Sequence, residues 1–322
     1  MHKRFVNQCT INLTIIPDGP ILIKSGREGA DPTKPDMEFV ETYREGGRSI
    51  YLPGSSLKGA IRAHAERIVR TVGRDKRPTN GNALWASNPL DLNELKYLDT
   101  LSDSKDIYRL SSFTDQMFGN TSIASRVRIE DAYPDKSQTL KIEERNGVAI
   151  DRVFGSVAVG PFNYQVCTSG EFKTKIHLKN FSLAQLGLIG LVLRDLNEGW
   201  FGLGFAKSRG LGMVEVQLNS ATVQYPGCVL DEESRQILHM GGQGQLPKPD
   251  TSLLGAGVFL EEDERKLYGF PTDDIQDTPV RAESMLLGFG VQMQWQGDVQ
   301  VRDLFEKAVR SWRKNLEGAT NR

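Results

Sequence analysis

The chain lacks several features that define common protein classes. Its 322 residues contain no apolar run near the roughly 18 residues that a membrane-spanning helix needs, and no apolar segment follows the charges at its N-terminus. We therefore expect neither a membrane span nor a signal peptide. Only three cysteines are present, Cys9, Cys167 and Cys228, and they lie far apart. This usage is typical of reduced thiols in a cytoplasmic protein.

Metal-binding and nucleotide-binding motifs are also missing. Neither the three cysteines nor the four histidines show the spacing of zinc ligands. The glycine-rich stretch 202–212 contains no Walker loop and no dinucleotide fingerprint, because the required lysine and third glycine positions do not match. An enzyme that acts on small-molecule nucleotides is therefore the least favoured function.

The net charge of -1 conceals an uneven distribution. Residues 1–212 hold 29 Lys and Arg against 24 Asp and Glu, whereas residues 213–322 hold 11 against 17. This asymmetry predicts different partners for the two parts, and it leaves the basic part open to nucleic acid. Chance variation in surface composition is the alternative.

The most informative segment is Tyr51–Arg62. Pro53 and Gly54 end a strand pattern, and Ser55 and Ser56 are favoured N-caps for a helix from about residue 56 to 72. Lys58 and Arg62 follow one turn apart. Free backbone N–H groups, two hydroxyls and two cations are the parts of an anion site, and phosphate is the usual biological anion. A capped helix with solvated basic residues is the alternative.

A second candidate for phosphate binding is the glycine-rich stretch 202–212. It carries four glycines together with Lys207, Ser208 and Arg209. Glycines let a backbone approach a ligand closely, and turn N–H groups with Lys and Arg can bind phosphates. A glycine-rich turn without a ligand is the alternative.

The order of elements predicts an α+β fold. Alternating strands are expected near residues 5–16, 171–178 and 213–225, with apolar-striped helices near 56–72 and 183–196. Two helices covering one face of a mostly antiparallel sheet are typical of the ferredoxin-like or RNA-recognition-motif arrangement. We place this domain at residues 1–225, with a loop-rich insertion at about 73–104. Residues 226–322 are interpreted as an acidic accessory module that ends in an amphipathic helix at 301–316.

Five motifs in a fixed order resemble the RAMP superfamily. They are Leu52-Pro-Gly-Ser-Ser-Leu-Lys-Gly59, Phe118-Gly119, Glu130-Asp-Ala132, Ile150-Asp-Arg152 and Lys207-Ser-Arg-Gly-Leu-Gly212. Within it, the chain is most similar to the repeating backbone subunits of type III CRISPR effector complexes. The extra segment after residue 225 resembles a divergent, type III-D-like subunit.

The resemblance implies an RRM-derived palm with a projecting thumb hairpin, expected at about residues 154–169. It also implies a subunit that binds the backbone of guide RNA, accommodates the complementary target RNA and assembles with other effector subunits. The RNA-binding residues implied by motif are Gly54, Ser55, Ser56, Lys58, Arg62, Arg152, Lys207, Ser208 and Arg209.

In that branch, a loop aspartate cleaves target RNA with Mg²⁺ or another divalent cation. Asp36 takes this position by resemblance, and Asp31 is the rival. The residues after Asp36 depart from the family pattern, since Met37-Glu38 stands in place of Ser-Pro. By its position in the loop, Asp36 is still the first candidate for the catalytic residue and for a metal ligand. The alternative is a backbone or capping subunit that binds RNA without cutting it.

A third hypothesis is guide-RNA processing by a histidine, as in a related branch. His64 lies in the signature helix, near its apolar face. A core or helix-surface histidine is favoured over a general base at this position.

Overall fold

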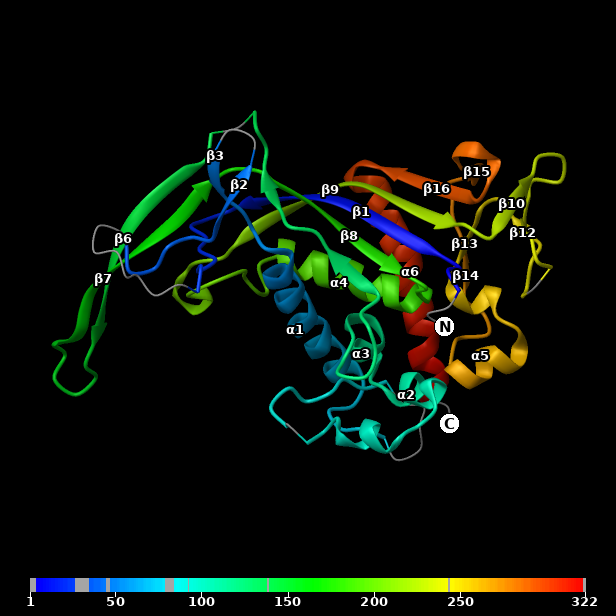
Figure 1. Ribbon diagram of the computed structural model, residues 1–322, viewed down its shortest axis with the longest axis horizontal. Coiled ribbons are helices and arrows are strands. Elements are labelled where there is room, and N and C mark those ends of the chain that lie inside the picture. The colour runs from blue at the N-terminus through cyan, green and yellow to red at the C-terminus, as the bar shows by residue number, and fades with distance from the viewer. Residues whose placement is uncertain are drawn as a thin grey trace.

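The computed structural model describes residues 4–26, 35–44, 47–78, 84–91, 93–137, 139–242 and 244–320, with side chains up to residue 312. Its centre is one antiparallel sheet. The strands of this sheet are β1 (Gln8–Pro17), β4 (Val127–Ile129), β5 (Tyr133–Pro134), β8 (Phe172–Lys179), β9 (Val214–Tyr225), β15 (Glu283–Ser284) and β16 (Val291–Gln296). They lie in the order β15-β16-β9-β1-β8-β4, and β5 also pairs with β8 (Figure 1).

Two helices connect the inner strands. They are α1 (Gly54–Val72) and α4 (Leu183–Asn197), so the chain runs β1-α1-β4-β8-α4-β9. With the spatial order β9-β1-β8-β4, this is the ferredoxin-like arrangement. The predicted α+β fold with a ferredoxin-like palm is confirmed.

Side-chain alternation decides which face of the sheet is packed. In β1, the side chains of Cys9, Ile11 and Leu13 are buried, whereas Thr10 and Asn12 between them are partly exposed. β8 repeats the pattern, with buried Ile176 and Leu178. Because successive side chains of a strand point to opposite faces, one face carries the core and the other stays polar.

Helix α4 lies inside the core because it is apolar almost all round. Ser182 caps it with a capping box that includes Gln185. Gly187 and Gly190 let it approach α6 (Gly297–Thr320) closely, since a Cβ on Gly187 would lie 2.9 Å from backbone atoms of Ala308.

A long hairpin projects from one end of the sheet (Figure 1). Its strands are β6 (Lys141–Ile150) and β7 (Val157–Ser169), which pair antiparallel. The hairpin therefore begins at Lys141, earlier than residue 154, where the thumb was expected to start. Strand β6 lies outside the range expected for the thumb, and its charged and partly exposed residues have no buried face that would mark it as a strand.

Residues after 225 do not stand apart from the sheet. Strand β16 pairs with β9 along Val291–Gln296, and Trp295 in it is fully buried. Helix α6 buries Val301, Phe305 and Trp312 on the predicted apolar stripe. The boundary expected at residue 225 therefore coincides with no break in the sheet.

Smaller elements complete the structure. The remaining helices are α2 (Ser104–Leu110), α3 (Phe113–Phe118) and α5 (Glu262–Tyr268). The remaining strands are β2 (Glu41–Arg44), β3 (Gly47–Ile50), β10 (Cys228–Asp231), β11 (Gln236–His239), β12 (Lys248–Pro249), β13 (Ser252–Leu254) and β14 (Ile275–Asp277). The expected insertion at 73–104 holds only a short 3₁₀ helix, Lys96–Thr100, among its described residues.

Candidate nucleic-acid interface

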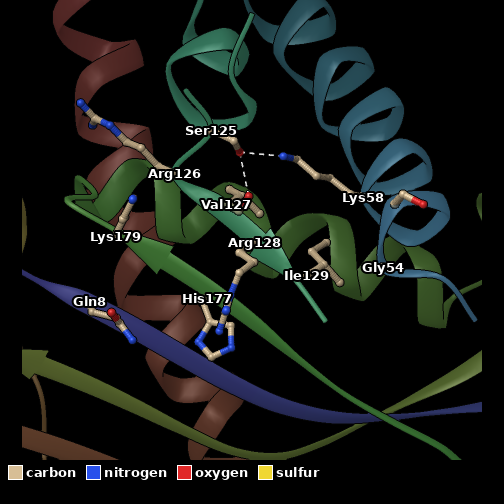
Figure 2. Close-up of a pocket in the computed structure, with 11 residues that line it drawn as sticks. Gln8, Gly54, Lys58, Ser125, Arg126, Val127, Arg128, Ile129, His177 and Lys179 are labelled. Carbon is tan, nitrogen blue, oxygen red and sulfur yellow. Dashed lines mark hydrogen bonds between the residues drawn. The ribbon is translucent and has the colours of Figure 1, made fainter. Parts of the chain in front are cut away.

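A pocket of about 560 Å³ lies at the free edge of β4, where α1 meets the outer strands of the sheet (Figure 2). Its lining comes from α1, β1, β4, β8 and the segment before β4. The residues are Gln8, Gly54, Ser55, Lys58, Ser125, Arg126, Val127, Arg128, Ile129, His177 and Lys179. No Asp or Glu is among them, and the lining cations outnumber the adjacent carboxylate of Glu130, which pairs with Arg128 at 3.1 Å. The hollow therefore favours an anion.

Lys58 reaches the pocket from the second turn of α1. Its Nζ donates to Oγ of Ser125 at 2.7 Å, and that hydroxyl donates to the carbonyl of Val127 at 2.7 Å (Figure 2). Partial burial, with a smaller contribution from the nearby Arg62 charge, lowers the pKa of Lys58. A phosphate beside this ammonium would oppose both effects, because an opposite charge favours the charged form.

Three pocket residues come from the polar face of the sheet and were missed by the sequence analysis. Arg128 lies on β4 and His177 and Lys179 lie on β8. The imidazole of His177 lies between Oγ1 of Thr10, 3.2 Å from Nδ1, and a carboxylate oxygen of Glu130, 2.8 Å from Nε2. The alternation of exposed and buried residues in β8 is the sequence signal that would have identified them.

Arg126 lies beneath the pocket and is buried. Its Nη1 donates to the carbonyl of Asn180 at 2.8 Å, and its guanidinium covers the ring of Tyr108 at 4.2 Å. Its Nη2 has no hydrogen-bond partner in the part of the chain that the structure describes. This buried cation adds to the positive potential of the pocket.

The first turn of α1 is capped differently from the prediction. Pro53 occupies the N-cap position, and Ser55 and Ser56 lie exposed inside the first turn, so neither serine is the N-cap. Asp131, from the chain after β4, instead accepts the N–H of Gly54 at 2.7 Å. The N–H groups of Ser55 and Ser56 still precede the first intrahelical donor, Leu57, and lie at the positive end of the helix.

Gly54 is required where α1 passes the edge of β4. A Cβ at this position would lie 2.2 Å from the carbonyl oxygen of Ile129. The glycine of the signature therefore permits a close backbone contact, which brings the first turn of α1 against the strand that carries Arg128.

Arg62 does not line the pocket. Its guanidinium donates to Glu66 at 2.8 Å, to Asp115 at 2.8 Å and to the carbonyl of Gly119 at 2.9 Å. Asp115 is fully buried, so Arg62 neutralises an internal carboxylate. RNA binding by Arg62 stays a prediction that these internal contacts do not favour.

The glycine-rich stretch follows α4 and packs against residues 20–22. Phe205 donates its N–H to the carbonyl of Leu22 at 2.7 Å, and a Cβ on Gly204 would lie 2.2 Å from that oxygen. Lys207, Ser208 and Arg209 form an exposed 3₁₀ turn at its end. Gly202, Gly204 and Gly212 thus permit close chain packing, while the three polar residues are open to a ligand.

His64, in α1, contacts both α4 and the residue that precedes the glycine-rich stretch. Its Nε2 lies 2.7 Å from a carboxylate oxygen of Asp195 in α4, and its ring stacks on Phe201 with centroids 4.3 Å apart. Both His64 and Asp195 are buried. A histidine enclosed in this way positions neighbouring elements, and it has no access to an RNA strand.

Asp36 lies exposed beside the middle of β7. Its Oδ2 accepts the backbone N–H of Asn163 at 2.9 Å. The next residue, Met37, donates its N–H to the carbonyl of Asn163 at 3.2 Å and accepts the N–H of Gln165 at 3.0 Å. The carboxylate is therefore anchored to the hairpin. The rival Asp31 lies outside the described residues.

The next question is whether Asp36 could help to hold a divalent cation. No group of three or more His, Cys, Asp or Glu residues that could hold a metal is found within the described ranges. Mg²⁺, however, usually keeps several waters and binds through one or two carboxylates together with substrate phosphates. A single anchored carboxylate fits such an arrangement, with RNA supplying the remaining oxygens.

Arg152 lies far from α1 along the hairpin. It is exposed in the turn between β6 and β7, where Asp151 accepts the N–H groups of Val153 and Phe154, each at 2.8 Å. These two hydrogen bonds lower the pKa of Asp151. The structure thus places most of the implied RNA-binding residues in three places: the pocket, the glycine-rich stretch and the hairpin tip. Ser56, in the first turn of α1, and Arg62, with its internal partners, do not line the pocket.

Comparison with known proteins agrees with this architecture. The family model of the RAMP superfamily matches residues 14–215, whereas no curated protein matches the chain. Among the described residues, no helix is long and apolar enough to cross a membrane. RAMP proteins generally bind RNA within multi-subunit CRISPR complexes, and some of them are RNA endonucleases. Since the match covers well over half of the chain and spans β1 to β9, the protein belongs to the RAMP superfamily.

Proposed function

We propose that the chain is a guide-RNA-binding backbone subunit of a type III CRISPR interference complex, of a III-D-like type, in the cytoplasm. The observation that carries this proposal is the pocket at the edge of β4, which is lined by Lys58, Arg128 and Lys179. Cations and backbone N–H groups bind phosphates without reading bases. A guide of variable sequence needs that kind of contact. The partners are guide RNA, complementary target RNA and other effector subunits.

The test of RNA binding replaces the pocket cations. We expect Lys58→Ala/Arg128→Ala/Lys179→Ala to weaken binding of a single-stranded RNA and to reduce the slope of log Kd against log salt by about 2, at roughly 0.7 per lost phosphate contact. The matched control removes three cations of α5 and α6, Lys266→Ala/Arg302→Ala/Lys307→Ala. Equal affinity and slope for the pocket variant and wild type would refute the proposal.

The second part of the proposal is cleavage of guide-paired target RNA beside Asp36. The target 2′-oxygen attacks the adjacent phosphorus, the bond from phosphorus to the 5′-oxygen breaks, and a 2′,3′-cyclic phosphate and a 5′-hydroxyl form. Asp36 accepts the proton of the 2′-hydroxyl, and water protonates the leaving 5′-oxygen. The hydrogen bond from Asn163 keeps the carboxylate oriented for this transfer. A divalent cation such as Mg²⁺, held by Asp36 and RNA phosphates, would offset the charge of the reacting phosphate.

Cleavage is tested in the assembled, guide-loaded complex with Mg²⁺ or with a chelator. We expect Asp36→Asn to abolish one or more metal-dependent cuts while guide and target binding persist. Glu38→Gln, two residues along the same segment, is the matched control, and Asp31→Asn tests the rival. If all three variants give the wild-type cleavage pattern, the subunit holds RNA without cutting it.

The non-catalytic alternative rests on the residues that replace the family pattern after Asp36. It predicts full guide retention and no cut assigned to this subunit. Guide processing by His64 is not favoured, because the imidazole is enclosed between Asp195 and Phe201. Cleavage of repeat RNA by the isolated protein, lost in His64→Ala, would be needed to restore that function.

A further inference from the structure

The C-terminal end of α1 lies on the side of the molecule away from the sheet (Figure 1). A second basic hollow is found there. Its volume is about 570 Å³. The lining residues follow one another along the chain: Arg70, Gly73, Arg74, Asp75, Lys76, Arg77 and Pro78. No residue of this hollow belongs to the signature or to any motif of the sequence analysis.

Two cations of this hollow are held by side-chain contacts, and the backbone that carries a third is fixed. Arg70 donates from Nη1 to the carbonyl of Ser87 at 2.7 Å. The guanidinium of Arg77 covers the ring of Tyr97 at 3.6 Å. Between them, the N–H of Arg74 donates to the carbonyl of Leu84 at 2.9 Å. Because the side chains of Arg70 and Arg77 are held in place, they lose less conformational entropy when they bind an anion.

Gly73 makes this arrangement possible. A Cβ at Gly73 would lie 2.3 Å from the carbonyl oxygen of Leu84, so the chain leaves α1 in close backbone contact with residues 84–85. Arg74 and Trp85 form a bridge there. The turn that carries Arg74, Lys76 and Arg77 is therefore packed against the protein and does not hang free of it.

The charge of the hollow exceeds what the helix end requires. A helix C-terminus carries about half a negative charge, which one cation in the last turn, here Arg70, can balance. Beyond the helix, Arg74, Lys76 and Arg77 stand against the single carboxylate of Asp75. No ion pair of Arg74 or Lys76 is found within the described residues. The hollow thus keeps a net positive charge, which favours an anionic ligand.

We propose that this hollow is a second binding site for the phosphodiester backbone of RNA, about 28 Å from the first along the 19 residues of α1. The proposal takes its ligand class from the RNA-binding function proposed above. None of the lining residues is aromatic, so no side chain of the hollow can stack on a base. The site therefore binds phosphate without selecting a sequence.

The test measures binding of a labelled single-stranded RNA of about 20 nucleotides, longer than one compact site covers, at several salt concentrations. We expect Arg74→Ala/Lys76→Ala to weaken binding and to reduce the salt slope by about 1.4, for two lost contacts at roughly 0.7 each. Arg67→Ala/Lys105→Ala removes two exposed cations outside the hollow and should leave the slope unchanged. Arg74→Gln/Lys76→Gln, which keeps most of the side-chain length, should reproduce the loss if folding of the alanine variant is disturbed.

Each result separates this inference from the proposed function. A loss confined to the Lys58/Arg128/Lys179 variant overturns the second site and leaves the first intact. A loss confined to the Arg74/Lys76 variant supports the second site while the pocket proposal fails. Unchanged RNA binding together with failure to join the other complex subunits would assign the hollow to a protein partner and overturn the inference.

Discussion

The two faces of the central sheet are built from alternate residues of the same strands, yet they carry different chemistry. The packed face presents Cys9, Ile11 and Ile176 to α1 and α4. The open face carries hydroxyls, amides and cations. Its residues include Thr10, Asn12, Lys173, Lys175, His177, Lys179, Thr222, Gln224, Gln292, Gln294 and Gln296.

Charge is also unequal across the open face. Lysines gather on β8, whereas β16 presents three neutral glutamines. The pocket lies at the β8–β4 side, where the cations are. Substitutions on the packed face should therefore change the free energy of unfolding, and those on the open face should change affinity for RNA with little effect on stability.

The largest effect is expected at Asp274, a buried carboxyl in the layer behind the packed face. It accepts the N–H groups of Leu183, at 2.9 Å, and Gly257, at 3.1 Å. Burial nevertheless dominates and raises its pKa from 3.8 to about 7. Its stabilising contribution is complete below about pH 4, where the unfolded state is also protonated, and is lost as the pH rises through 7. The loss amounts to about 4 kcal/mol.

Urea unfolding at a series of pH values checks this expectation. In Asp274→Asn, the decline of the unfolding free energy between pH 4 and pH 8 should be much shallower than in the wild type. Asp277→Asn, at an exposed position three residues further along the chain, is the control. Parallel curves for the wild type and Asp274→Asn would show that this carboxyl does not govern the pH dependence.

The second effect concerns the contact between α4 and α6. A Cβ on Gly187 would meet backbone atoms of Ala308 and Val309, which cannot rotate away. We expect Gly187→Ala to lower the unfolding free energy by about 1–3 kcal/mol. Gly59→Ala is the matched control, because nothing lies within 4 Å of its Cβ position. Alanine there should stabilise α1 by about 0.5–1 kcal/mol, and chemical denaturation of the two variants measures the contrast.

The third effect should appear in binding and leave stability unchanged. Lys175→Ala/Lys179→Ala removes two exposed cations of the open face, so the salt slope of RNA binding should fall by about 1.4. Its unfolding free energy should stay within about 0.5 kcal/mol of wild type. Gln294→Ala/Gln296→Ala, on β16 of the same face, should alter neither quantity. A similar loss of affinity in both variants would place the RNA across the whole face and contradict the charge comparison.

The fold could be predicted from the sequence because apolar residues recur with the period of a strand or of a helix. β1, β9, α1 and α4 follow alternation or helical spacing closely, and their bounds lie within about three residues of the expected ones. Strand β6 was missed because both of its faces are solvated, which leaves no apolar period to detect. The join of β16 to β9 was also invisible, since strand pairing across 65 residues leaves no local pattern.

The candidate site was only partly predictable for a similar reason. Lys58 and Gly54 lie in a local motif, and the pocket contains both. His177 and Lys179 come from a strand more than 100 residues later and reach the pocket through the sheet. Arg62 shows the converse, because its position in the motif suggested RNA while the structure gives it a buried partner, Asp115.

The smallest effect tests the start of α1, where the two faces meet at the edge of β4. Because Asp131 accepts the N–H of Gly54 from outside the helix, Ser55→Ala and Ser56→Ala should each change the unfolding free energy by less than about 0.5 kcal/mol. Asp131→Ala should cost about 1 kcal/mol, the usual value of a lost N-cap. Thermal or chemical unfolding of the three variants measures these differences in unfolding free energy. If either serine variant cost as much as Asp131→Ala, the serines would be the effective caps and the pocket would have fewer free groups to offer a phosphate.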